Sequence, residues 1–312
     1  MPRVEQEFGA PFWVAHRADL RAVLLKAAQK AGVDIQTGHR VDVVDFGTMA
    51  GRPMRRPRYR VNGREWFEAD VIICADGINS RIRRDIMNLH GQPDASPCLI
   101  LFFKSDFQLT KVTTLAQVTG DAAYRITIPR EKLLDQPQLL KLADESVGYR
   151  WMGPQGHIMA YPIRNHQLIN MVLLHPDRRD TEESWTATGS KSNMMEFYSG
   201  WSPMVRALLD LVEEEEIPEW QLKIHGPLAS WVEGNVALMG DACHATLPYV
   251  AQGAAQAAED AGVLAAVLSL ISSKADIHTA LLIYSVSYNL TVAQQCLLFF
   301  YSRNCVNLVV KM

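Results

Sequence analysis

The sequence predicts an α/β fold in which a split α/β domain carries an inserted β-sheet domain. Two apolar runs, Val71–Ala75 and Asn235–Asp241, each lead through a loop into a helical pattern, which is typical of open α/β sheets. Between them, segments such as Tyr124–Ile128 and Leu168–Leu174 alternate apolar and polar side chains, as antiparallel strands do. The predicted split domain comprises residues 1–92 and 222–275, the inserted domain residues 93–221, and a C-terminal helix residues 276–312.

Length and composition agree with a globular protein of two domains. The chain has 312 residues, and roughly 150 residues per domain is usual. A formal net charge of -3 does not indicate a nucleic-acid-binding protein, which would carry an excess of positive charge. Five cysteines without a CxxC pair argue against a disulfide framework and against a zinc site built on paired thiolates. We therefore expect a reduced, cytoplasmic setting and no metal site.

The elements near the start follow from local patterns. Apolar residues at helical spacing predict a helix over 18–31, and Val33–Phe46 reads as one or two strands. The basic, Pro-broken segment Arg52–Arg58 indicates an exposed loop rather than a nucleic-acid patch. Asn62-Gly63, between two β-rich segments, predicts a hairpin with a type I′ turn.

Helices are also predicted over 80–87, 252–270 and 280–300. No run of 18 apolar residues is present, so no membrane span is expected. The short apolar stretch Cys296–Tyr301 leaves a membrane-surface role open as an alternative. The sequence does not indicate an oligomeric state.

The first chemical motif is Asp76-Gly77, at the end of a predicted buried strand. Ligands of open α/β sheets bind at this edge, and Gly77 permits close backbone approach. Ser80 is placed to cap the next helix, and Arg81, Arg83 and Arg84 could supply charge for a phosphate. The alternative is an ordinary strand–turn–helix connection with a capping serine.

The second motif runs from Gly240 to Ala261. Asp241 is placed at a strand end to accept hydrogen bonds from sugar-like hydroxyls, and Pro248 stiffens the loop. The helix that starts near Gly253 and Ala254 has almost no side-chain bulk, so a flat ring could lie against its peptide N–H groups. His244 is better interpreted as motif packing than as a catalytic residue.

These strings resemble the Asp-Gly and Gly-Asp motifs of the FAD-dependent aromatic-ring hydroxylases, the salicylate-hydroxylase-like flavoprotein monooxygenases. His16–Leu20 resembles the HRxxL segment of that family, and the likeness runs from about Phe12 to Leu270. The resemblance implies a three-layer, Rossmann-like FAD-binding domain with an inserted substrate domain. It also implies cofactor contacts from Arg17, Asp76, Gly77, Gly240, Asp241, Pro248, Gly253 and Ala254.

The resemblance also implies a substrate site and a reaction. Tyr124-Arg125 and Tyr161-Pro162 match pairs that line the family's substrate pocket, so Arg125 would steady a phenolate or carboxylate and Tyr161 would orient the ring. A purely structural role for both residues stays open. With FAD, NAD(P)H and dioxygen, the family hydroxylates or epoxidises aromatic or polyketide-like molecules through a flavin C4a-hydroperoxide. The resemblance implies such a reaction in secondary metabolism.

The sequence departs from the family in lacking the GxGxxG turn and the acidic residue that follows it. This predicts a shortened member without the N-terminal βαβ unit: a truncated gene model, a splice form or a degenerate copy. FAD affinity should then be low. The residues at 284–295 also differ from the Arg-rich helix that is usual there. The alternatives to an active enzyme are a non-catalytic remnant that binds a small aromatic, and an unrelated nucleotide-binding protein.

Overall fold

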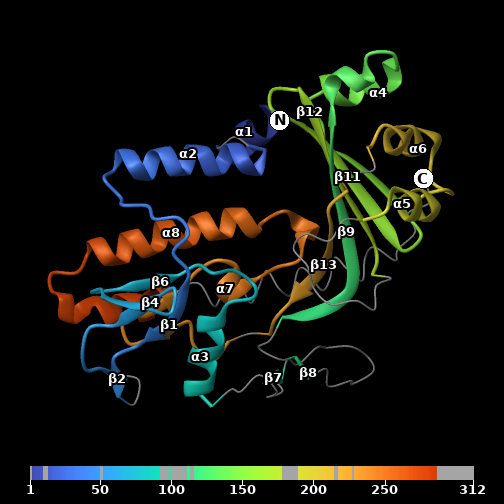
Figure 1. The fold of residues 1–312 in the computed structure, drawn as a ribbon. Coiled ribbons are helices and arrows are strands. Elements are labelled where there is room, and N and C mark those ends of the chain that lie inside the picture. Colours follow the sequence, from blue (N-terminus) through green and yellow to red (C-terminus); the bar gives the residue numbers. More distant parts are fainter. Residues whose placement is uncertain are drawn as a thin grey trace. The chain divides into compact units, whose positions relative to one another are not determined.

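A computed structural model (Figure 1) describes residues 2–9, 13–49, 52–91, 98–99, 111–112, 116–177, 189–213, 217–226 and 228–286. The chain forms two compact units. The first, here the sheet unit, combines Met1–Gln36 with Thr119–Leu222, and the second, the α/β unit, combines Thr37–Val118 with Lys223–Met312. Residues 1–36 therefore group with the β-rich segment, whereas the predicted domains placed them with the α/β segments.

A five-stranded sheet dominates the sheet unit, with strand order β10-β11-β12-β9-β13. Its strands are β9 (Gln117–Pro129), β10 (Tyr149–Gly153), β11 (Gly156–Ile163), β12 (Leu168–Pro176) and β13 (Glu219–Ile224). The pairs β10–β11, β11–β12 and β12–β9 are antiparallel. This confirms the antiparallel strands that the alternating pattern predicted.

One face of this sheet is buried under helices. Ile126, Ile158 and Met171 lie on it, each 3% exposed or less. It packs against residues of α4 (Pro137–Asp144), α5 (Lys191–Phe197) and α6 (Pro203–Asp210), with the 3-10 turn η1 (Arg130–Leu133) beside α4 (Figure 1). The side chains between these positions point the other way, because successive residues of a strand alternate between faces.

The N-terminal segment of the sheet unit contains α1 (Pro2–Phe8) and α2 (Arg17–Lys30). The predicted helix over 18–31 is confirmed, and His16 caps it by accepting from the Ala18 N–H at 3.3 Å. No residue of α2 is buried. Arg164 donates two hydrogen bonds, of 2.7 and 2.6 Å, to the Asp19 carboxylate, and this contact joins α2 to the turn between β11 and β12.

The α/β unit begins with a small antiparallel sheet, β1 (Val41–Asp45), β4 (Arg58–Val61) and β5 (Glu65–Glu68). The predicted hairpin is confirmed, since Asn62 and Gly63 have the positive φ angles, 50° and 70°, of a type I′ turn. β2 (Thr48–Met49) pairs with β3 (Arg52–Pro53), so the predicted loop starts inside a short ribbon.

The basic segment near this ribbon is largely neutralised by acidic neighbours. Arg55 and Arg58 contact Asp45 at 2.5 and 3.0 Å, and Arg56 contacts Asp70 at 3.1 Å. The arginines are between 40% and 54% exposed. This arrangement agrees with a solvated turn rather than a nucleic-acid surface.

A second sheet of the α/β unit has the order β14-β15-β6, from β14 (Val232–Glu233), β15 (Val236–Leu238) and β6 (Ile72–Cys74). β15 and β6 are parallel, as the buried apolar runs predicted. The helices of this unit are α3 (Arg81–Leu89), α7 (Asp241–His244) and α8 (Gly253–Ser269), with 3-10 turns η3 (Pro248–Val250) and η4 (Lys274–Asp276). The mixed α/β class is therefore confirmed.

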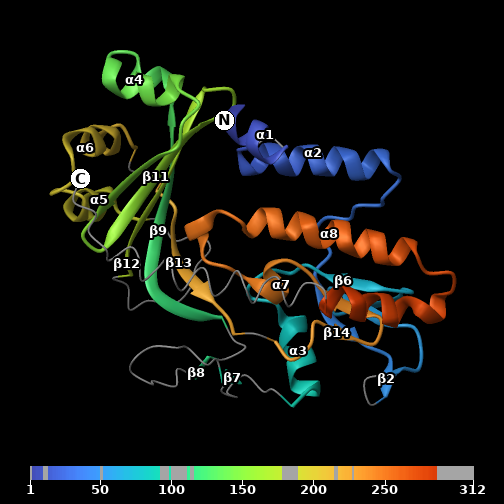
Figure 2. The same cartoon turned by 180° about the vertical axis from the view of Figure 1, so that it is seen from behind.

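The core of the α/β unit forms where this sheet meets its helices. Ile86 of α3, Leu238 of β15 and Leu264 of α8 belong to one buried cluster, and α8 runs along the sheet in both views (Figures 1 and 2). Residues 277–286 are helical, and the rest of the predicted C-terminal helix lies outside the described residues. The short ribbon β7 (Cys98–Leu99) and β8 (Lys111–Val112) completes the elements. No helix in the described residues is both long and apolar enough to cross a membrane.

Candidate functional site

The two predicted motifs leave neighbouring parallel strands at the same sheet edge. In the register of β6 and β15, Ile72 lies beside Val236 and Cys74 beside Leu238. The Met239 N–H donates to the Cys74 carbonyl at 3.0 Å, which extends this pairing to the strand ends. Asp76-Gly77 and Gly240-Asp241 follow directly, so the structure brings these residues together at the edge where open α/β sheets bind ligands.

The Asp76-Gly77 turn has free space at Gly77, and Asp76 is hydrogen-bonded to the first residue of α3. Gly77 has a φ of 81°, and no atom lies within 4 Å of the position that a Cβ would take. Asp76 is exposed, and its Oδ2 accepts from the Arg81 N–H at 3.2 Å. Ser80 accepts from the Arg83 N–H at 3.0 Å, which confirms the predicted cap of α3.

Arg83 corrects one expectation from the sequence. Its side chain is 1% exposed and donates to the Ala242 carbonyl at 3.1 Å and to the Ile78 carbonyl at 2.5 Å. The guanidinium thus joins the turn after β6 to α7, and its buried position makes a role as surface charge for a phosphate wrong. Arg81 and Arg84, in contrast, are exposed.

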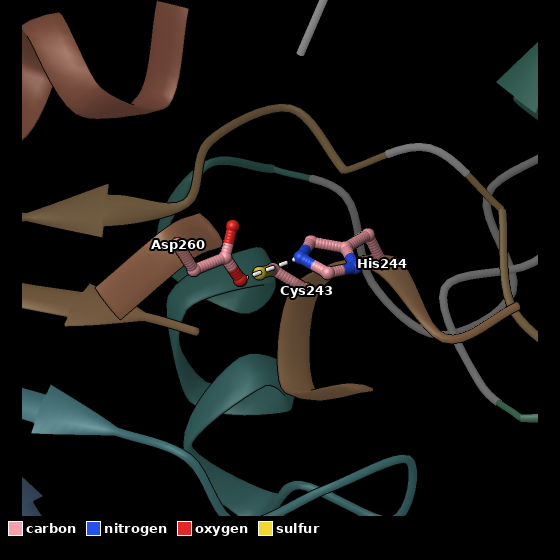
Figure 3. Close-up of side chains that lie close together, drawn as sticks. All are labelled: Cys243, His244 and Asp260. Carbon is pink, nitrogen blue, oxygen red and sulfur yellow. Dashed lines mark hydrogen bonds and ion pairs between the residues drawn. The ribbon is translucent and has the colours of Figure 1, made fainter. Parts of the chain in front are cut away.

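The start of α7 is held by the fully buried Asp260 of α8. Its Oδ2 accepts from the Gly240 N–H at 2.7 Å and lies 2.6 Å from the His244 Nε2 (Figure 3). Gly240 needs its φ of 61°, which side chains rarely adopt. This bond supports the interpretation of His244 as packing within the motif. Sequence reasoning assigned no role to Asp260, although it lies inside the recognised string.

Cys243, His244 and Asp260 offer three donor atoms within 4.8 Å of one another, a spacing that suits a metal ion. The chemistry of the cluster does not fit one. The Asp260 Oδ2 already accepts from two donors, and the Cys243 thiol donates to the Gly240 carbonyl at 3.3 Å. Burial, followed by the charge of Asp260, raises the pKa of Cys243 well above its ordinary value, so the sulfur stays protonated. We interpret the cluster as a hydrogen-bond network.

Beyond α7, the chain passes through a loop into the first turn of α8. Pro248 opens η3, and Ala251 ends it with a left-handed φ of 56°. Gly253 is half-buried and Ala254 is exposed, and no described side chain caps this end of the helix. Its first N–H groups therefore have no partner within the helix, and the helix dipole makes this turn favourable for negative charge. Asp241 is exposed at the same strand edge.

His225 accepts a hydrogen bond from the loop that follows α7. Its Nε2 accepts from the Ala245 N–H at 3.3 Å, while Nδ1 lies 2.8 Å from the Gly226 carbonyl, so the neutral ring with a proton on Nδ1 satisfies both contacts. Burial, followed by the charge of Arg83, lowers the pKa of His225 to about 4. The sequence carried no signal for this residue beyond a lone histidine.

The other predicted residues lie in the sheet unit. The register places Tyr161 beside Asn170 and Asn170 beside Thr127, while Val172 lies beside Arg125. These five side chains share the face turned away from the buried core, and we call this set the open face. Arg17, at the start of α2, is exposed and close enough to Arg125 for their charges to interact.

Two groups of the open face are chemically distinctive. Burial, opposed in part by Arg125 and a hydrogen bond from Asn170, raises the pKa of Tyr161, so its phenol stays neutral and can donate. The Arg125 guanidinium lies over the Trp220 ring, 4.9 Å from the ring centre. Burial and the charge of Arg17 lower the pKa of Arg125, although an arginine stays charged at neutral pH.

Comparisons with known proteins agree with this architecture. Residues 5–296 match the model of the family described as FAD binding domain. The FAD-dependent monooxygenase ntnJ of Nectria sp is 39% identical over 280 residues, covering 89% of this chain and 59% of that protein. The 3-hydroxybenzoate 6-hydroxylase of Polaromonas naphthalenivorans is 30% identical and covers 82% of this chain and 54% of that protein.

The solved structure of a salicylate hydroxylase substrate complex aligns with a TM-score of 0.72 at 26% identity, covering 93% of this chain and 65% of that one. The mixed α/β fold therefore matches that of FAD-dependent hydroxylases. The chain belongs to the FAD-binding monooxygenase family, among the salicylate-hydroxylase-like aromatic hydroxylases. It spans about three fifths of the length of the curated relatives that it matches.

Proposed function

We propose that this chain provides the flavin-binding and substrate-binding parts of a FAD- and NAD(P)H-dependent monooxygenase. Its substrate is a small aromatic or polyketide-like compound of secondary metabolism, which it hydroxylates or epoxidises with dioxygen. The observation that carries the proposal is the first turn of α8, which no described side chain caps, together with the exposed Asp241 that follows β15. Relatives named FAD-dependent monooxygenases, at 39% and 38% identity, support it.

The residues at the strand edge suit a flavin and its sugar-like chain. The uncapped turn at Gly253 and Ala254 offers peptide N–H groups to the electron-poor ring, and Asp241 offers carboxylate oxygens to hydroxyl groups. Gly77 leaves room for a ligand at the neighbouring turn. When bound, FAD accepts a hydride from NAD(P)H and activates dioxygen, and the remaining tasks belong to the protein.

We assign those tasks as follows. Asp241, Gly240, Pro248, Gly253 and Ala254 hold and orient the flavin, and Asp76 and Gly77 serve both it and the nicotinamide nucleotide. Arg17 adds a cofactor contact. In the substrate domain, Arg125 binds an acidic group of the substrate, and the neutral Tyr161 phenol donates a hydrogen bond that orients the ring.

Flavin binding tests the proposal directly. Titration of FAD into the purified chain should quench flavin fluorescence with saturation, and Asp241→Ala should weaken the binding about 10- to 100-fold, because hydroxyl groups lose a charged acceptor. Asp276→Asn, an exposed acid of η4, is the matched control and should bind FAD normally. Equal binding by Asp241→Ala and its parent would count against the site.

A second candidate function is an aromatic-binding chain without catalysis. It is favoured by Arg125 and Tyr161, which could bind an acidic aromatic ligand without a flavin. NAD(P)H oxidation that depends on an added aromatic distinguishes the two. Oxidation with FAD supplied supports the monooxygenase, whereas ligand binding without oxidation supports the second candidate.

A further inference from the structure

The open face carries a cation without a counter-charge among the described residues. Arg125 is half-buried, and its Nε atom is fully buried without a hydrogen-bond partner. Its guanidinium forms no ion pair with any residue that the structure describes. After burial, the largest effect on its pKa comes from another cation, Arg17. Holding an uncompensated charge away from water is unfavourable unless a ligand supplies the opposite charge.

Trp220 is the aromatic residue that lies against this cation. It lies on β13, next to β9 in the sheet, and the Arg125 N–H donates to the Pro218 carbonyl at 3.0 Å, so the two strands are joined at this position. The ring centre is 4.9 Å from the guanidinium carbon, within the range of a cation–π contact. The half-buried indole therefore covers one side of the guanidinium and restricts its rotation.

We propose that Trp220 is a positioning residue that holds Arg125 in one orientation on the open face, so that the guanidinium meets an anionic group of the ligand in a fixed geometry. The inference rests on the proposed role of Arg125 in substrate binding and adds Trp220 as the residue that orients it. A guanidinium presents a flat set of N–H donors that matches a carboxylate, and an orientation fixed in advance reduces the entropy lost on binding.

The neighbours of Arg125 favour an anion over a neutral ligand. Tyr161 is a neutral phenol that donates, Asn170 donates to that phenol, and Arg17 adds a second positive charge. No carboxylate is among the described groups that shift the pKa of Arg125. A neutral analogue of the same shape would leave the Arg125 charge uncompensated, so the ratio of the two affinities measures the proposed selection.

The test compares ionised aromatic acids with their neutral amides of the same shape. Salicylate and salicylamide, and 1-hydroxy-2-naphthoate and its amide, are titrated into the full chain by calorimetry without flavin. Because no cofactor is needed, the result does not depend on monooxygenase activity. We expect the parent to prefer each carboxylate, and Trp220→Leu to reduce the carboxylate affinity about 3- to 30-fold while changing amide affinity less than about twofold.

Two further variants keep the result interpretable. Trp220→Phe retains an aromatic face and should retain most of the preference even if Trp220→Leu unfolds. Trp66→Leu removes a tryptophan that likewise stacks on arginines, Arg58 at 4.8 Å and Arg60 at 5.7 Å, but lies in the α/β unit, so it should leave both affinities unchanged. Equal weakening of acid and amide by the Trp220 variants, an unchanged preference, or no preference in the parent would overturn the inference.

Discussion

Asp260 is the side chain on which the start of α7 depends. It is fully buried and accepts from the Gly240 N–H and from His244. Asp260→Asn keeps the shape but replaces a charged acceptor, so we expect a loss of about 1–3 kcal/mol in the free energy of unfolding. Urea titration followed by circular dichroism measures it. Asp276→Asn, exposed in the same unit, should change stability little, and a stable Asp260→Asn would contradict the assigned role.

His225 makes the stability of the α/β unit sensitive to acid. Its pKa is about 4 in the folded protein and 6.5 in an ordinary histidine, so between these values the unfolded chain binds a proton that the folded chain excludes. The contribution of His225 to the free energy of unfolding is therefore fully present above about pH 6.5 and is lost as the pH decreases toward 4. At pH 5 the loss from this residue is about 2 kcal/mol.

The variant His225→Gln isolates this contribution. The difference between urea midpoints at pH 7.5 and pH 5 should shrink in the transition of the α/β unit, whatever the variant does to absolute stability. His157, whose pKa burial also lowers to about 4, lies in the sheet unit and provides the matched control. An undiminished acid sensitivity in His225→Gln would show that other groups carry it.

At the scale of single residues, the sequence predicted which strand ends carry the motif residues but not the contacts of their side chains. Asp76, Gly77, Gly240 and Asp241 meet at one edge because parallel strands align their ends. The prediction for Arg83 was wrong. A basic residue at the start of a helix suggests an anionic ligand, but Arg83 is buried and donates to two backbone carbonyls. Such partners are distant in sequence, here by 159 residues for Ala242.

At the scale of the elements, the helix α2 is little buried. None of its residues is buried, although Leu20, Val23 and Leu24 are apolar and between 43% and 64% exposed. Its side-chain connection to the sheet is the paired contact between Asp19 and Arg164. Hydrogen bonding to Arg164 lowers the pKa of Asp19, so the connection weakens on acidification through the range in which that carboxylate is protonated.

Breaking this contact should loosen α2 alone. We expect Asp19→Asn to accelerate amide hydrogen exchange across residues 17–30, while the melting temperature stays close to that of the parent, because half-exposed ion pairs contribute little to global stability. Arg130→Gln, which breaks the Arg130–Asp144 pair in the same unit, is the control and should leave exchange in α2 unchanged. Unchanged exchange in Asp19→Asn would show that other contacts hold the helix.

Elements with strong local signals were predictable from the sequence. The Asn62-Gly63 hairpin, the helix now seen as α2 and the antiparallel strands around Tyr124 and Leu173 follow from turn chemistry and periodicity. Strand pairing was not predictable, because register depends on contacts between distant segments. The placement of Trp220 beside Arg125 is an example, since 95 positions separate them in the numbering, 220 minus 125.

The whole molecule has two separate hydrophobic cores. One cluster, which includes Ile86 and Leu238, lies within the α/β unit, and the other, which includes Ile158 and Met171, lies within the sheet unit. Because each unit buries its own apolar side chains, unfolding need not be a single transition.

We therefore expect two transitions in urea. Ile86→Ala should lower the midpoint of one transition and Met171→Ala that of the other, each by the equivalent of about 2–5 kcal/mol, since both side chains are fully buried. Backbone NMR signals from each unit assign the transitions. A single transition that both variants shift equally would show that the units unfold cooperatively.

Along the strands of the large sheet, the side chains that pack in the core alternate with those of the proposed substrate site. Ile126 and Met171 lie on the buried face. Their neighbours Arg125, Asn170 and Val172 lie on the open face. Mutations at every second position can therefore change ligand preference without disturbing the packing that keeps the sheet folded.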